Sequence, residues 1–134
     1  MSNYSGSNNN PRVIIIQKLY GKFFNEDNHL DFPKHRFKKF IKDIVLGTIE
    51  RDEVILAELE TKLGDKIIFD NLDKVFQIII KAATYEFLYK PSVSINIIIK
   101  EYLVSSNFFL NNDQTKYLNA LLDNIGKKLR SKNA

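Results

Sequence analysis

The sequence contains no cysteine and no tryptophan, and only three prolines and five glycines among its 134 residues. Without cysteine, the chain can form neither disulfides nor thiolate metal sites. It has no long uncharged apolar run of the kind that crosses a membrane. Its first residues, MSNYSGSNNNP, include neither the basic nor the apolar part of a secretory signal. We therefore expect a cytoplasmic protein without a membrane segment.

Residues that carry enzymatic chemistry are also scarce. The two histidines, His29 and His35, are separated by a proline-containing turn and have no carboxylate or cysteine at metal-ligand spacing. The sequence has no phosphate-binding glycine loop and no G-x-S-x-G motif. Acidic pairs such as Asp52–Glu53 lie at loops or helix starts, where the helix dipole accounts for them. We predict that the chain is not an enzyme and holds neither a cofactor nor a metal.

The composition is that of a soluble globular protein, with 44% hydrophobic and 27% charged residues. The net charge of +4 and the pI near 9.2 permit binding to nucleic acid without establishing it. Residues 1–10 are mostly Ser, Asn and Gly, and we predict that they are disordered. We expect residues 11–134 to form one helical domain, with lobes at about 11–64 and 65–134.

The stretch from Asn71 to Val93, NLDKVFQIIIKAATYEFLYKPSV, is predicted to hold the central helix. Asp70 and Asn71 can cap its start, and Pro91 ends it. Two apolar stripes recur at helical spacing: Leu72, Val75, Phe76, Ile79, Ile80, Ala83 and Phe87 on one side, and Ile78, Ala82, Tyr85 and Tyr89 on another. Because a helix that is apolar nearly all round is normally enclosed by others, this pattern predicts an all-α fold.

Five further helices are predicted around it, and no strand pattern competes with them. They run from Pro11 to Phe24 with Asn10 as cap, from about Lys34 to Gly47, from about Ile49 to Leu63 with Gly64 as C-terminal cap, from Ser94 to about Asn107, and from about Asp113 onward. The predicted core residues of the first three are Val13, Ile16, Leu19, Tyr20 and Phe23, then Phe37, Phe40, Ile41, Ile44 and Val45, then Ile55, Leu59 and Leu63.

One face of the last helix combines an aromatic ring with lysines. At about 100° per residue, this face comprises Asp113, Lys116, Tyr117, Ala120, Asn124 and Lys127. Such a face suits single-stranded RNA, since lysines meet phosphates while the ring stacks on a base. The alternative, which the pattern alone favours, is a solvated face with Tyr117 partly packed at its edge.

Two other polar features leave alternatives open. Glu86 follows Ala83 by one turn of the central helix, and a carboxylate there is costly unless it is paired. It either reaches solvent at the edge of the apolar stripe or meets a basic group of a partner. The second feature is a basic cluster for which a solvated face is the favoured interpretation: His35, Lys38, Lys39 and Lys42.

After Pro11, nearly the whole chain resembles the NusB family of bacterial transcription antitermination factors. Its first helix fits the pattern R-x-x-x-x-Q-x-L-Y through Arg12, Gln17, Leu19 and Tyr20. The stretch LDKVFQIIIKAATYEFLYKPSV is similar to the family's central helix, which ends in Y-E-L before a proline-bearing turn. The closing pattern K-F-V-N-G-V-L-D-x-I is matched at Lys116, Asn119, Leu122, Asp123 and Ile125.

This resemblance implies a fold of two small helical bundles around the buried central helix. It also implies an antitermination factor that pairs with NusE, a small-subunit ribosomal protein, and binds boxA-type nascent RNA. The bound pair acts in an RNA polymerase antitermination complex and supports ribosomal RNA transcription. By matching positions, Glu86 and Tyr20 would contact the partner, and the RNA side would comprise Arg12, Gln17, Lys18, Asp113, Lys116 and Tyr117.

The chain also departs from the family pattern. The arginine-rich start common in the family is replaced by NYSGSNNN, which predicts weak RNA binding alone and strong dependence on NusE. Lys100 replaces an asparagine, Ala120 replaces a glycine, and Tyr117 stands where Phe is usual. A helical protein-interaction module without RNA binding is the main alternative. The RNA-binding domain of an RNA methyltransferase is disfavoured because the chain ends at Ala134, and a homodimer that hides the RNA face stays open.

Overall fold

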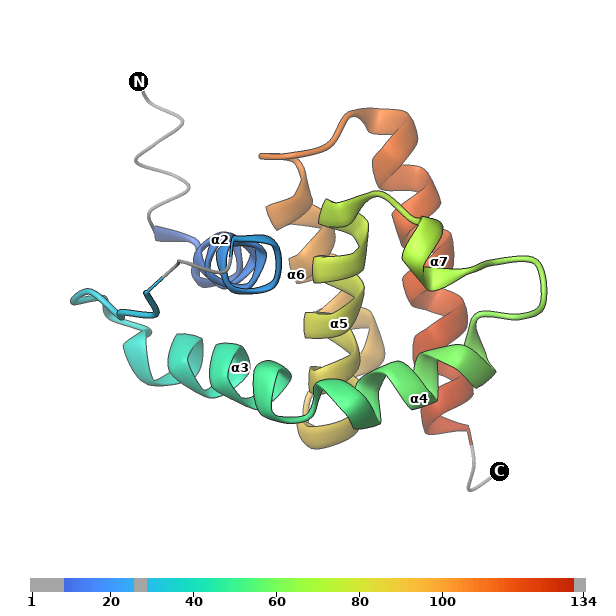
Figure 1. Cartoon of the computed structure of the whole chain (residues 1–134), viewed down its shortest axis with the longest axis horizontal. Coiled ribbons are helices and arrows are strands. Elements are labelled where there is room, and N and C mark those ends of the chain that lie inside the picture. Colours follow the sequence, from blue (N-terminus) through green and yellow to red (C-terminus); the bar gives the residue numbers. More distant parts are fainter. Residues whose placement is uncertain (1–8, 26–28, 132–134) are drawn as a thin grey trace.

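The fold is all-α, as predicted. The computed structural model describes residues 9–25 and 29–131, and these contain helices and loops but no strand. Most of the N-terminal segment for which disorder is predicted, residues 1–8, lies outside this range. The elements in Figure 1 are α2 (Pro11–Phe24), α3 (Lys38–Glu50), α4 (Asp52–Lys62), the 3₁₀ turn η1 (Phe69–Asn71), α5 (Lys74–Tyr89), α6 (Ile95–Ser106) and α7 (Asn112–Arg130).

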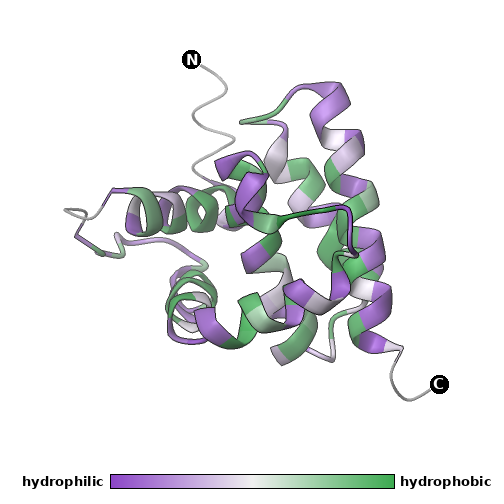
Figure 2. Ribbon diagram, turned by 45° about the vertical axis from the view of Figure 1, so that its right-hand side comes forward, coloured by the Kyte–Doolittle hydropathy of each residue, from purple (hydrophilic) through white to green (hydrophobic). Residues whose placement is uncertain are grey.

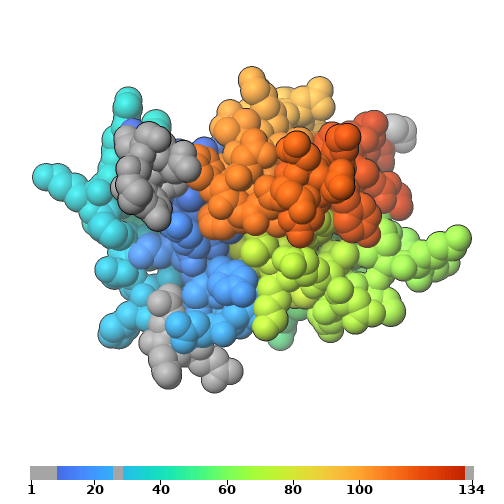
Figure 3. All heavy atoms as spheres, turned by 90° about the horizontal axis from the view of Figure 1, so that it is seen from above, coloured from blue at the N-terminus to red at the C-terminus, as the bar shows by residue number. Residues whose placement is uncertain are grey.

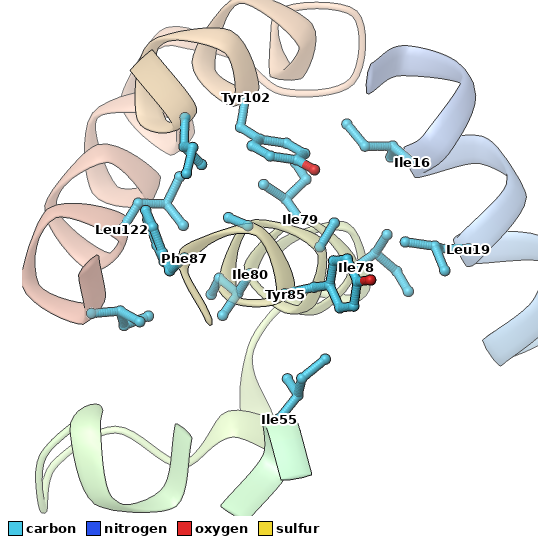
Figure 4. Packing of buried hydrophobic residues seen from close by; sticks show 14 of the residues in the cluster. Ile16, Leu19, Ile55, Ile78, Ile79, Ile80, Tyr85, Phe87, Tyr102 and Leu122 are labelled. Carbon is cyan, nitrogen blue, oxygen red and sulfur yellow. The ribbon is translucent and has the colours of Figure 1, made fainter. Parts of the chain in front are cut away.

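Helix α5 lies at the centre of the molecule. It contacts α2, α3, α4, α6 and α7, and every residue from Ile78 to Phe87 is buried. Figure 4 looks along α5 and shows side chains of the surrounding helices, such as Ile16, Ile55 and Leu122, directed toward it. One buried apolar cluster joins residues of all six of these helices. The predicted buried central helix is therefore confirmed, while the division into lobes at residues 64 and 65 stays a prediction.

The start of α5 differs from the sequence-based prediction. Asp73, rather than Asp70 or Asn71, is the N-cap, and its Oδ1 accepts a hydrogen bond of 2.8 Å from the Val75 amide. Residues Phe69–Asn71 form the separate turn η1, and Leu72 is extended with ψ 154°. The extended Leu72 therefore separates η1 from α5. Asp70, Asn71 and Asp73 can all cap a helix, and the sequence does not show which of them begins α5.

Helix α3 begins four residues later than predicted. The Nδ1 atom of His35 accepts a hydrogen bond of 2.9 Å from the Phe37 amide, which forms a turn before the helix. Phe37 is therefore the residue that precedes α3, and its side chain is 41% exposed. The prediction that Phe37 lies in the core is wrong, whereas Ile41, Ile44 and Val45 are buried as expected.

Helix α3 also extends to Glu50 rather than Gly47, and α4 begins at Asp52 rather than Ile49, whereas several other predicted helix ends are confirmed. Asn10 Oδ1 accepts hydrogen bonds from the Arg12 and Val13 amides, and Ser94 Oγ accepts one from Ile97. Asn111 forms a capping box with Gln114 at the start of α7. After α4, Gly64 has φ +92°, a conformation that glycine adopts without steric cost.

Figure 2 shows hydrophobic and hydrophilic residues interspersed along the helices. In α7, Asp113, Lys116 and Lys127 are exposed, while its apolar stripe is buried and comprises Leu118, Leu121, Leu122, Ile125 and Leu129. Among the described helices, none combines the length and apolar character needed to cross a membrane.

Candidate nucleic-acid interface

Arg12, Glu86 and Tyr102 form a buried polar cluster where α2, α5 and α6 meet. Arg12 Nη2 donates to Glu86 Oε1 at 2.7 Å, and Arg12 Nε donates to Oε2 at 3.1 Å. The Tyr102 hydroxyl also donates to Oε2. The guanidinium lies 4.9 Å from the ring centroid of Phe40 and 5.2 Å from that of Tyr102. The side chain of Glu86 is 0% exposed and that of Arg12 is 11% exposed.

This cluster corrects the sequence-based prediction for Glu86 and shows what Arg12 contacts within the chain. The Glu86 side chain does not reach solvent and is not left unpaired for the basic group of another protein. It forms an ion pair with Arg12 of the same chain. Arg12 was expected on the RNA side, but its guanidinium is committed to Glu86 and held between two rings. Through these contacts the two residues link α2 to α5 and α6.

Burial and the nearby Glu86 carboxylate raise the pKa of Tyr102 well above 10.0. The folded protein therefore retains this proton at pH values where the unfolded chain has lost it. The contribution to stability is complete below pH 10 and declines as the pH rises further. We expect Tyr102→Phe to be less stable than wild type at neutral pH, with a difference that shrinks above pH 10. Urea unfolding of both proteins across this pH range measures the effect, and a constant difference would contradict it.

The predicted RNA-facing side of α7 is largely on the surface. Asp113, Lys116 and Tyr117 are exposed in its first two turns, and Lys127 lies farther along the same face. The Tyr117 side chain is 47% exposed, while its ring centroid lies 5.7 Å from that of buried Phe76. The ring thus contacts the core through Phe76 and is otherwise about half exposed, and an exposed ring can stack on an RNA base.

Tyr117 belongs to a wider surface formed by three helices. The Tyr20 and Phe24 rings lie 5.1 Å apart, and Lys74 Nζ lies 5.1 Å from the Phe24 ring centroid. Lys74 and Phe76 both belong to the first turn of α5, so this turn separates Phe24 from Tyr117. Figure 3 shows α2, the start of α5 and the first turns of α7 adjoining on one face. We call Tyr20, Phe24, Lys74, Lys116 and Tyr117 the aromatic surface.

The placement of Tyr20 corrects another prediction. Tyr20 was expected in the core, but it is 38% exposed, and Ile15 is buried instead. The core side of α2 is centred between Ile15, Ile16 and Leu19, which turns Tyr20 outward. The contributions of Phe24 and Lys74 were missed, because their proximity depends on how α2 crosses the start of α5.

Gln17 and Lys18 lie beside a different feature. Together with residues 32–36 and Lys38 they line a cleft of about 600 Å³ between α2 and the start of α3. Lys18 Nζ lies 3.1 Å from Asp31 Oδ1, and this hydrogen bond and charge lower the pKa of the Asp31 carboxyl. The six residues predicted to bind RNA are therefore divided between the buried cluster, this cleft and α7.

Within residues 9–25 and 29–131, no group of three histidines or carboxylates is arranged to hold a metal ion.

Comparison with known proteins identifies the family. The profile of the NusB family matches residues 9–127. The chain is 31% identical over 93 residues to the transcription antitermination protein NusB of Sphingopyxis alaskensis, an alignment that covers 69% of this chain and 62% of the relative. It is 27% identical over 110 residues to the protein of the same name from Bartonella tribocorum, covering 82% of this chain and 68% of the relative.

The NusB protein of Maricaulis maris is 26% identical over 113 residues, covering 75% of this chain and 71% of the relative. The chain thus spans about 62 to 71% of the length of these three relatives. The family profile covers the five α-helices from α2 to α6 and most of α7. On this match, the chain belongs to the NusB family.

Proposed function

We propose that this protein is an RNA-binding transcription antitermination factor that pairs with NusE and binds boxA-type RNA. The observation that carries the proposal is the exposed Tyr117 ring beside Lys116 on α7. The relatives described above are transcription antitermination proteins, and they indicate the process. In that role the protein and NusE act together on nascent RNA in an RNA polymerase antitermination complex and support ribosomal RNA transcription.

The aromatic surface offers each type of contact that single-stranded RNA needs. A base stacks on the open side of Tyr117, and Lys116 and Lys74 attract the adjacent phosphates. The exposed carboxylate of Asp113 can accept a hydrogen bond from a base amino group and favour one base over another. The Tyr20–Phe24 pair, 38% and 36% exposed, adds apolar area that suits contact with the protein partner.

Replacing Tyr117 with alanine is expected to weaken RNA binding by about 1–3 kcal/mol, the usual contribution of one stacked base. The melting temperature should change little, because the side chain is 47% exposed. Fluorescence anisotropy with labelled RNA measures the affinity, and thermal unfolding measures the stability. Tyr117→Phe retains the ring and serves as the matched control, with near wild-type affinity expected.

The same experiment separates the proposal from a protein-interaction module without RNA binding. That alternative is supported by the exposed Tyr20–Phe24 pair, which would fit a protein partner alone. It predicts equal RNA signals for wild type and Tyr117→Ala, with NusE binding intact. A large fall in melting temperature would instead assign Tyr117 to the core.

A further inference from the structure

The cleft between α2 and the start of α3 is strongly basic. Lys18, Lys34, Arg36 and Lys38 line it, and none of the described lining residues is acidic. Lys18 is neutralised by Asp31 at 3.1 Å. For Lys34, Arg36 and Lys38, no carboxylate of the described residues lies within salt-bridge distance. Three positive charges therefore line one cleft without a counterion among the residues that the structure describes.

The end of a helix adds to this positive potential. Helix α3 begins at Lys38, has no side-chain cap and carries no acidic residue in its first turn. The first amide groups of a helix and its dipole favour a negative charge at this end. An anion in the cleft would thus meet both cationic side chains and the N-terminus of a 13-residue helix.

The rest of the lining indicates which kind of anion fits. The Phe32 ring and the exposed amide of Gln17 also line the cleft, and they offer an aromatic contact and hydrogen bonds beside the cations. A volume of about 600 Å³ is within the range of pockets that hold small organic groups. Phosphates accompanied by sugars and bases use all three types of group.

The position of Gln17 connects the cleft to the aromatic surface. On α2, Gln17 lies one turn from Ile14, which lines the cleft, and one turn from Tyr20 on the aromatic surface. Gln17 therefore lies between the two features along α2. A strand bound at the aromatic surface reaches the cleft by crossing α2 at Gln17.

We infer that the cleft of Lys34, Arg36 and Lys38 binds phosphates of the same single-stranded RNA that contacts the aromatic surface. This inference rests on the proposed function and extends it. The sequence favours a solvated face for the basic cluster near His35, whereas this inference gives that cluster a role in RNA binding. These cations also supply phosphate contacts that the arginine-free segment NYSGSNNN cannot.

The test compares two triple variants with equal charge change. The cleft variant carries Lys34→Gln, Arg36→Gln and Lys38→Gln. The control variant carries Lys66→Gln, Lys100→Gln and Lys128→Gln, three exposed lysines that belong neither to the cleft nor to the residues assigned to the RNA-facing side of α7. RNA affinity is measured by anisotropy in the presence of NusE over a series of salt concentrations, and thermal unfolding confirms that both variants fold.

Loss of three phosphate contacts should flatten the plot of log affinity against log salt by about 2, at roughly 0.7 per contact for single strands. The control should keep the wild-type slope. Equal flattening in both variants, or an unchanged slope in the cleft variant, would overturn the inference while leaving the proposed function intact. Loss of NusE binding with RNA binding unchanged would assign the cleft to a protein and overturn it too. Absence of RNA binding by wild type would defeat both proposals.

Discussion

Replacing Glu86 with alanine is expected to destabilise the protein by about 3–5 kcal/mol, the usual effect of removing one partner of a buried ion pair. The Arg12 guanidinium, 11% exposed, would remain between the Phe40 and Tyr102 rings without its counterion. The Tyr102 hydroxyl would lose its acceptor at the same time. Denaturant unfolding at neutral pH measures the loss.

A double-mutant cycle tests the coupling between Arg12 and Glu86. Arg12→Met and Glu86→Leu each leave one charge or polar partner unmatched, whereas the double variant removes both charges and keeps apolar volume. We expect the double variant to lose far less stability than the sum of the single losses. Additive losses, or a loss below about 1 kcal/mol for Glu86→Ala, would show that the pair does not hold α2 in place.

Replacing Ile79 with alanine is expected to cost about 2–5 kcal/mol of stability, as for other buried aliphatic side chains. Ile79 is 0% exposed in the middle of α5, and Figure 4 shows it within the cluster of apolar side chains around this helix. Close packing prevents the neighbours from filling the space that the lost methyl and methylene groups leave.

Ile97→Ala is the matched control for Ile79→Ala, because it removes the same atoms from a side chain that is 52% exposed on α6. Its effect should stay within about 0.5 kcal/mol. Denaturant unfolding of the two variants gives the comparison directly. Equal effects of the two substitutions would mean that α5 is not the centre of the core.

Helix positions were predictable because apolar periodicity is local and strong. The sequence pattern identifies α5 as buried, and Asn10 and Ser94 as caps, all of which the structure confirms. The starts of α3 and α5 were missed because each depends on a single hydrogen bond, from Phe37 to His35 and from Val75 to Asp73. Several nearby side chains could have made these bonds, so periodicity alone does not choose among them.

The candidate site was only partly predictable, since its parts are far apart in the chain. Periodicity places Lys116 and Tyr117 on the exposed side of α7, as observed. The Arg12–Glu86 pair joins residues 74 positions apart, and helix periodicity gives no information on which helices face each other. A signal was present, because Arg12 lies on the same side of α2 as Ile16 and Leu19 and needs an acidic partner there.

The most direct test of the RNA-binding role is fluorescence anisotropy of a labelled boxA-type RNA titrated with this protein, with and without NusE, at two salt concentrations. We predict weak binding by the protein alone, tighter binding with NusE, and discrimination against a scrambled RNA. Higher salt should weaken the complex, because lysines and arginines meet the phosphates. Absence of RNA binding both with and without NusE would contradict the RNA-binding role and leave a NusB-family protein that acts through protein contacts alone.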